Sequence, residues 1–136
     1  MKNKGFTLIE LLAVIVILAI IALIATPMIL GVIDDAKKKS AQTSAQYYVE
    51  AVEKTMMTEQ MNNKSVADGT YKVGADGVTL TSGANSFKVN VKGDKAAENG
   101  TIVIENGQVK SATLTFKGII DKAVTVDNTG KATIAS

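Results

Sequence analysis

The feature that most constrains this chain is an uncharged apolar run near its N-terminus. Residues 11–33 carry no charged side chain, and residues 11–25 are wholly apolar. As a helix this run spans about 35 Å, which is enough to cross a hydrocarbon core of about 30 Å. Lysines lie on both sides of the run, so the flanking charge indicates no clear orientation. The run therefore predicts a membrane-spanning helix.

Glu10 lies directly before this run and is the first acidic residue of the chain. An unpaired carboxylate in hydrocarbon is costly, so Glu10 requires either a cationic partner or a position among solvated headgroups. A secretory signal peptide fits poorly, because the run is long and no small-residue cleavage site closes it. A plain membrane anchor explains the run but leaves Glu10 unexplained.

The amino-acid composition excludes most of the usual kinds of catalytic site. The chain has no Cys, His or Trp, and all 15 of its basic residues are lysine. It therefore lacks a thiol, the usual general base near neutral pH, the bidentate phosphate clamp and the usual zinc ligands. The net charge of +2 is too small to indicate nucleic-acid binding. We expect neither enzyme activity nor a cofactor.

Helical periodicity continues beyond the apolar run. Apolar residues follow spacings of four, three, four and four at Ala41, Ala45, Tyr48, Val52 and Met56. We predict one helix that continues to about Gln60, with Asn62-Asn63 as its stop signal. A helix of about 80 Å makes sense if its exposed first half packs against copies of itself.

Pro27 interrupts the apolar half of this predicted helix. It removes one backbone donor and strains the preceding turn, and Gly31 lies four residues further on. Two outcomes stay open at this helix-breaking pair. One is a modest kink, and the other is local unwinding of residues 19–28 on assembly.

The second half of the chain alternates apolar and polar residues at period two. The predicted strands are 70–73, 78–81, 87–91, 101–105, 108–116, 123–126 and 131–134. Asn106-Gly107 indicates a tight hairpin of the primed-turn type, and residues 127–130 indicate a looser one. We predict a small antiparallel sheet of four or more strands.

One face of this sheet is expected to cover the helical stripe that includes Tyr48, Val52 and Met56. The candidate residues of that face are Ile102, Ile104, Val109, Leu114, Phe116 and Val124. The fold class is therefore α+β, with a long N-terminal helix packed on an antiparallel sheet. The expected parts are a hydrophobic helix over 6–33, an amphipathic helix over 34–62 and a β-sheet head over 63–136.

The stretch from Lys4 to Leu12, KGFTLIELL, closely resembles the start of type IV prepilins, the precursors of type IV pilus and pseudopilus subunits. The resemblance covers about the first 30 residues. It implies a leader of residues 1–5, cleavage after Gly5 by a prepilin peptidase, and N-methylation of Phe6. In the family the glutamate that matches Glu10 pairs with the new amine of a neighbouring subunit. That pairing makes Glu10 a register device, because a subunit out of register would leave its charge unpaired. Pro27 matches a helix-interrupting proline that is usual in the family.

The resemblance further implies a structural role. The chain is expected to begin as a membrane precursor and to polymerise into a helical surface filament, with help from an assembly platform and ATPase. One alternative is a pseudopilin of a type II secretion or competence system. An alternative of another class is a monomeric membrane-anchored binding module. The composition, with no Cys and with lysine as its basic residue, resembles that of pilins of Gram-positive bacteria.

Asp121 and Asp127 are weak metal candidates, by analogy with the acidic C-terminal loops of major pseudopilins. They show no regular oxygen-ligand spacing and are better explained as ordinary turn residues. We therefore expect no metal.

Overall fold

The computed structural model describes residues 5–91, 97, 99–116, 118–120 and 122–135. Residues 1–4 of the predicted five-residue leader lie outside the described residues, and so does the metal candidate Asp121. The chain divides into two compact units, Met1–Ala36 and Lys37–Ser136, and each is described by itself.

Helix α1 spans Leu8–Met61 and supplies the first unit's structure and the helix of the second. It confirms the predicted long helix, which begins just before the apolar run and ends one residue beyond Gln60. The helix ends where the asparagine pair predicts. Asn63 adopts a left-handed conformation with φ 61°, and the Lys64 amide donates to the Glu59 carbonyl at 2.8 Å. This arrangement is a Schellman-type cap, and Asn63 tolerates its positive φ better than most residues would.

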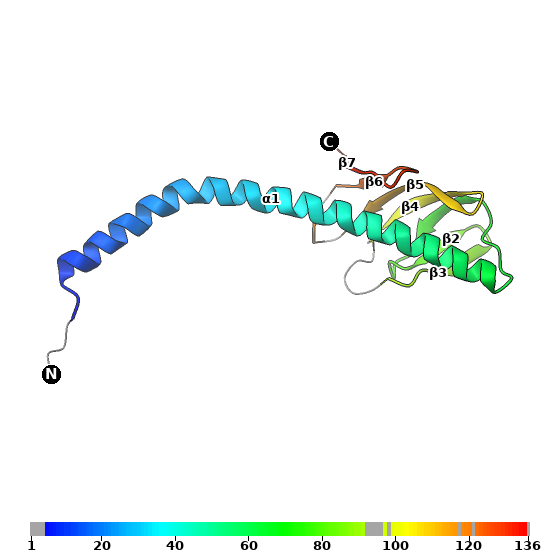
Figure 1. The fold of residues 1–136 in the computed structure, drawn as a ribbon, viewed down its shortest axis with the longest axis horizontal. Coiled ribbons are helices and arrows are strands. Elements are labelled where there is room, and N and C mark those ends of the chain that lie inside the picture. The colour runs from blue at the N-terminus through cyan, green and yellow to red at the C-terminus, as the bar shows by residue number, and fades with distance from the viewer. Residues whose placement is uncertain (1–4, 92–96, 98, 117, 121, 136) are drawn as a thin grey trace. The chain divides into compact units, whose positions relative to one another are not determined.

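Within the first unit α1 stays helical through Pro27 and Gly31. It bends along this stretch (Figure 1). Pro27 leaves one backbone carbonyl without its helical donor, and the Thr26 hydroxyl donates to the Ala22 carbonyl one turn back. Both features are known local causes of helix bending. In this single copy the outcome is a bend, and the unwinding of residues 19–28 on assembly stays a prediction.

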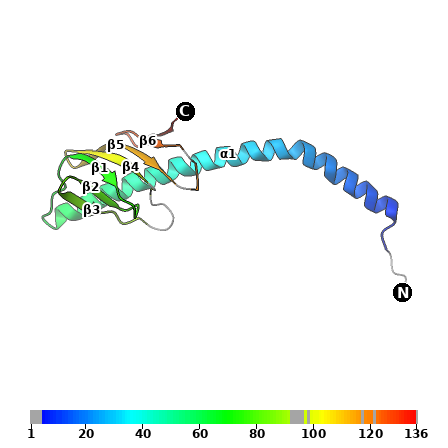
Figure 2. The same cartoon turned by 180° about the vertical axis from the view of Figure 1, so that it is seen from behind.

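The second unit contains one antiparallel sheet (Figure 2). Its seven strands are β1 Gly69–Val73, β2 Thr79–Ser82, β3 Asn85–Lys88, β4 Asn99–Glu105, β5 Gln108–Thr115, β6 Val124–Val126 and β7 Ala132–Ile134. They lie in the order β3-β2-β1-β4-β5-β6-β7. The α+β arrangement predicted from the sequence is confirmed.

Two strands, β3 and β4, differ from the prediction by two or more residues at an end, and the other five agree with it to within one residue. The strand expected at 87–91 is β3, and it begins at Asn85 because Gly83, at φ 61°, turns the chain directly after β2 and pairs Ser82 with Asn85. Val89 lies beyond β3, where its amide donates to the Val78 carbonyl at 2.8 Å. Strand β4 begins at Asn99 rather than at residue 101, because Gly100 allows close approach to β5.

The β4–β5 hairpin has the predicted primed turn. Asn106 and Gly107 both have positive φ, at 56° and 74°, as a type I′ turn requires. The Asn106 amide also donates to Asp68 Oδ1 at 2.9 Å, which ties the turn to the segment before β1.

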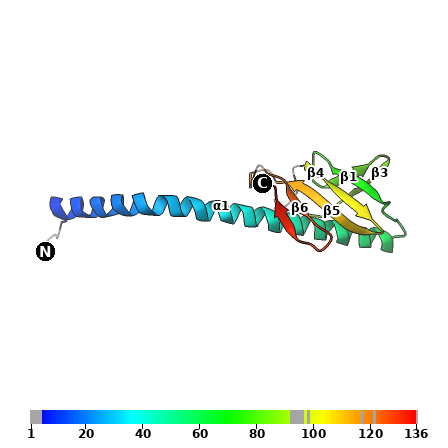
Figure 3. The same ribbon diagram turned by 90° about the horizontal axis from the view of Figure 1, so that it is seen from above.

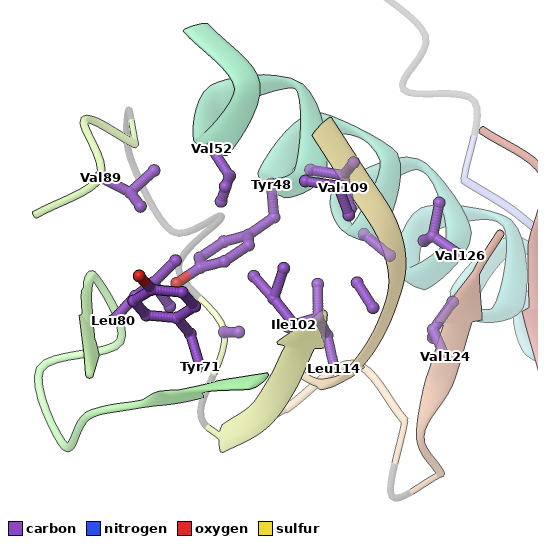
Figure 4. Close-up of a cluster of buried hydrophobic side chains, with 14 of the residues drawn as sticks. Tyr48, Val52, Tyr71, Leu80, Val89, Ile102, Val109, Leu114, Val124 and Val126 are labelled. Carbon is purple, nitrogen blue, oxygen red and sulfur yellow. The ribbon is translucent and has the colours of Figure 1, made fainter. Parts of the chain in front are cut away.

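The core lies between the sheet and the part of α1 that belongs to the second unit (Figures 3 and 4). The five residues of the predicted helical stripe are all buried there, and so are the six predicted sheet residues. Tyr71 and Leu80 complete one end of the core, where the Tyr71 and Phe87 rings meet edge to face at 5.3 Å. The spacing of apolar residues therefore identified both faces of the core.

Tyr48 is fully buried in this core, and its hydroxyl donates to the Gly77 carbonyl at 2.9 Å. Burial, assisted by the nearby Asp76 charge, raises the pKa of Tyr48 far above its ordinary value of 10.0. In the unfolded chain Tyr48 loses its proton near pH 10, whereas in the folded chain it keeps that proton to higher pH. The unfolded state then binds fewer protons, so stability is fully present below pH 10 and falls as pH rises above it.

We therefore predict that Tyr48→Phe flattens the alkaline loss of stability. The substitution removes one hydrogen bond, so it should cost about 1–2 kcal/mol at pH 7. Urea unfolding of the detergent-solubilised chain between pH 8 and 11 should show the wild-type and Tyr48→Phe stabilities converging above pH 10. Comparing the two chains cancels the lysine titration that they share. Parallel curves would contradict this role of Tyr48.

Candidate processing and assembly site

The predicted cleavage point lies in the non-helical segment before α1. Gly5 and Phe6 are exposed, and the Phe6 side chain is 87% accessible. A Cβ added at Gly5 would meet no atom within 4 Å, so this fold does not itself demand glycine there. The Gly5–Phe6 bond is therefore presented in an accessible, non-helical stretch one residue before the helix cap.

Thr7 and Glu10 form a reciprocal capping box at the start of α1. The Glu10 amide donates to Thr7 Oγ1, and the Thr7 amide donates to Glu10 Oε2, each at 3.2 Å. The Leu11 amide donates to the Thr7 carbonyl at 3.1 Å, which makes Thr7 the N-cap. Two amides that the helix itself cannot satisfy are thus satisfied, and the helix begins at a fixed residue.

Sequence reasoning missed this second role of Glu10. The signal was present, because Thr-x-x-Glu directly before an apolar run is the known pattern of a capping box. A carboxylate accepts several hydrogen bonds, so the contact with Thr7 leaves capacity for a cation as well. Capping and pairing with a neighbouring amine are therefore compatible at Glu10.

The apolar residues of the first unit form a continuous exposed surface on α1. Leu8 and Ile9 are 85% and 79% accessible, and every large apolar side chain from there to Ile33 is exposed. In the described part of the chain α1 is also the helix that is long and apolar enough to cross a membrane. An apolar surface of this extent requires lipid or another protein to cover it.

Asp127 is engaged in a turn of the second unit. Its Oδ1 accepts hydrogen bonds from the Thr129 amide at 2.9 Å and the Lys131 amide at 3.0 Å, and also from the Thr129 hydroxyl. These hydrogen bonds, led by that of the Thr129 hydroxyl, lower the pKa of Asp127 below its ordinary value. The described residues contain no group of three acidic side chains that could hold a metal ion. Because Asp121 lies outside them, the metal candidates stay untested.

A hollow of about 740 Å³ in the second unit lies between α1 and the end of β3 with the segment after it. Its lining includes Tyr47, Glu50, Lys54, Lys88 and Asn90. Glu50 and Lys54 pair with each other at 3.5 Å and are both exposed.

Comparison with known proteins points to the N-terminal segment. Residues 1–26 match the family model described as the prokaryotic N-terminal methylation motif, and this stretch includes Gly5, Phe6 and Glu10. A "Fimbrial protein" of Moraxella nonliquefaciens is 39% identical over 81 residues, which are 60% of this chain and 49% of that protein. The chain thus matches about half the length of this curated relative. No solved structure matches the chain.

Proposed function

We propose that the chain belongs to the type IV pilin family and is a structural subunit of a type IV pilus, because residues 1–26 match the N-terminal methylation motif and part of the chain is similar to a fimbrial protein. The family consists of structural subunits rather than enzymes, which agrees with a composition that lacks Cys and His. The observation that carries the proposal is the match of residues 1–26 to the methylation motif, and the exposed apolar surface of α1 supports it.

The proposed pathway starts with the precursor in the membrane, where α1 crosses the bilayer. A prepilin peptidase cuts between Gly5 and Phe6 and methylates the new amine. Glu10 then pairs with the amine of a neighbouring copy, and the exposed apolar residues of α1 pack together in the filament core. Burial contributes on the order of 25 cal/mol per Å² of apolar surface, which offsets the extraction of each subunit from lipid in part. An assembly platform and its ATPase supply the remaining energy.

The first test is the intact mass and N-terminal peptide of the chain in a fraction sheared from the cell surface. Cleavage after Gly5 gives a mature chain that begins at N-methyl-Phe6. Abundant mature chain with this N-terminal peptide in the sheared fraction is the expected result. Mature chain confined to the membrane would instead indicate a pseudopilin of a secretion or competence system. An uncut chain that stays in the membrane would overturn the proposal and favour the anchored binding module.

A further inference from the structure

A compact charge cluster follows the uncharged run on α1. Asp34 and Asp35 come first, and the three lysines 37–39 come next, all of them exposed. Acidic residues thus precede basic residues by two to five positions along one helix, and Asp34–Lys38 and Asp35–Lys39 are each four apart. Asp34 and Lys38 already make interactions within the chain, and the i,i+4 spacing favours such pairs. In a polymer these exposed charges would also face the charges of neighbouring copies.

In a helical polymer, one known contact between two neighbouring copies sets the shift between them along the filament, and this shift determines which residues of the two copies lie level. This step rests on the proposed function, in which identical copies repeat by one rotation and one rise. If the Phe6 amine of one copy lies level with Glu10 of its neighbour, the first copy is shifted by four residues, or about 6 Å of helix. Every part of that copy moves by the same rise, so the shift applies equally at the far end of the apolar run.

At this shift the charge clusters of the two copies are complementary. Asp34 of the shifted copy lies level with Lys38 of its neighbour, and Asp35 lies level with Lys39. No like charges face each other, because the shifted copy's own Lys38 lies level with the neutral Gln42. With no shift, each aspartate and each lysine would instead face its own counterpart, which is repulsive.

The two sets of charges also share a spacing along the helix. Phe6 to Asp34 and Glu10 to Lys38 are both 28 residues, or four heptads. We propose that Asp34 and Asp35 of one subunit pair with Lys38 and Lys39 of the neighbour whose Glu10 receives its amine. Charges at both ends of the apolar run would then act together to fix the register.

The test uses two charge-reversed chains in cells that carry the assembly machinery. One chain carries Asp34→Lys with Asp35→Lys, and the other carries Lys38→Asp with Lys39→Asp. Each reversal places like charges level between copies and also breaks the pairs within its own helix. When the two chains are produced together, pairs between copies can form again, whereas pairs within each helix stay broken. Mixing therefore separates pairing between copies from pairing within one helix.

Each reversed chain alone should give sheared filaments below about a tenth of the wild-type amount, because like charges now face each other. Coproduction should restore at least about half, in filaments that contain both chains by mass spectrometry. Lys37→Asp is the matched control, since Lys37 lies level with the neutral Ala41 and Ile33 at this shift, and it should assemble normally. Cleavage after Gly5 confirms that each variant is inserted correctly.

Normal assembly of either reversed chain alone would overturn the inference, and so would failure of the mixture. In both cases wild-type filaments would show that the proposed function stands. Absence of filaments from the wild-type chain would overturn the proposed function, and this inference with it.

Discussion

A chain with Glu10→Gln is expected to enter the membrane and be cut after Gly5, yet to assemble few filaments. Glutamine at the third helical position still completes a capping box, so the Thr7 contacts and the start of α1 should persist. Only the negative charge is lost. In the filament core the neighbouring amine is then left without its partner, which costs about 3–5 kcal/mol per subunit, or more than 100-fold in docking affinity.

Two further variants separate the charge of Glu10 from its capping role. Thr7→Ala removes the N-cap hydroxyl but keeps the carboxylate, so it should cost about 0.5–2 kcal/mol at the helix start and leave assembly largely intact. Glu10→Ala removes both functions and should assemble no better than Glu10→Gln. Filament mass in the sheared fraction, normalised to processed chain in the membrane, measures each effect. Wild-type filament amounts from Glu10→Gln would show that charge is not what the site requires.

Much of the fold was predictable because its signals are local. Helical spacing identified Tyr48, Val52 and Met56 as the buried stripe, and strand alternation identified the facing sheet residues. Asn106-Gly107 carries its turn type in its own backbone preferences, so no tertiary information was needed. The asparagine pair at the end of α1 worked for the same reason.

What the sequence did not predict depends on contacts between distant residues. The Gln42 side chain donates to the Ala132 carbonyl at 3.2 Å, and that of Gln46 donates to the Gly130 carbonyl at 3.0 Å. These bonds tie α1 to the β6–β7 hairpin across more than 80 residues of sequence. They follow from how the sheet lies on the helix, which no local pattern specifies. The early start of β3 also escaped prediction, because a two-residue turn at Gly83 shortened the expected loop.

The candidate site also combines features that local sequence predicts with features that depend on other molecules. Gly5, Phe6 and Glu10 were predicted from a short motif, whereas the capping box was missed although it joins residues only three apart. Their proposed roles in cleavage and docking involve a peptidase and other copies of the chain. One copy presents the groups that would take part. Its exposed apolar surface indicates that lipid or another protein covers it, but not which of the two.

The second large effect is expected at Gly100, which holds β4 against β5. Gly100 has φ 146° and pairs with Leu114. A Cβ placed there would lie 2.2 Å from the Thr113 carbonyl oxygen and 2.9 Å from the Leu114 Cα, both of them backbone atoms. Neither atom can rotate away, so an alanine would force the two longest strands apart beside the fully buried Leu114.

Gly100→Ala should therefore destabilise the second unit by about 3–5 kcal/mol, from backbone strain together with overpacking. For a unit of this size, that corresponds to a fall in melting temperature of more than about 10 °C. The matched control is Gly83→Ala, where φ is 61° but no atom lies within 4 Å of the added Cβ. It carries the conformational cost alone, about 1–2 kcal/mol. Thermal unfolding of the detergent-solubilised chains, followed by tyrosine fluorescence, compares the two directly, since the chain has no Trp. Equal losses at both positions would mean that β4 and β5 shift apart easily, and that close strand contact at Gly100 does not hold the sheet together.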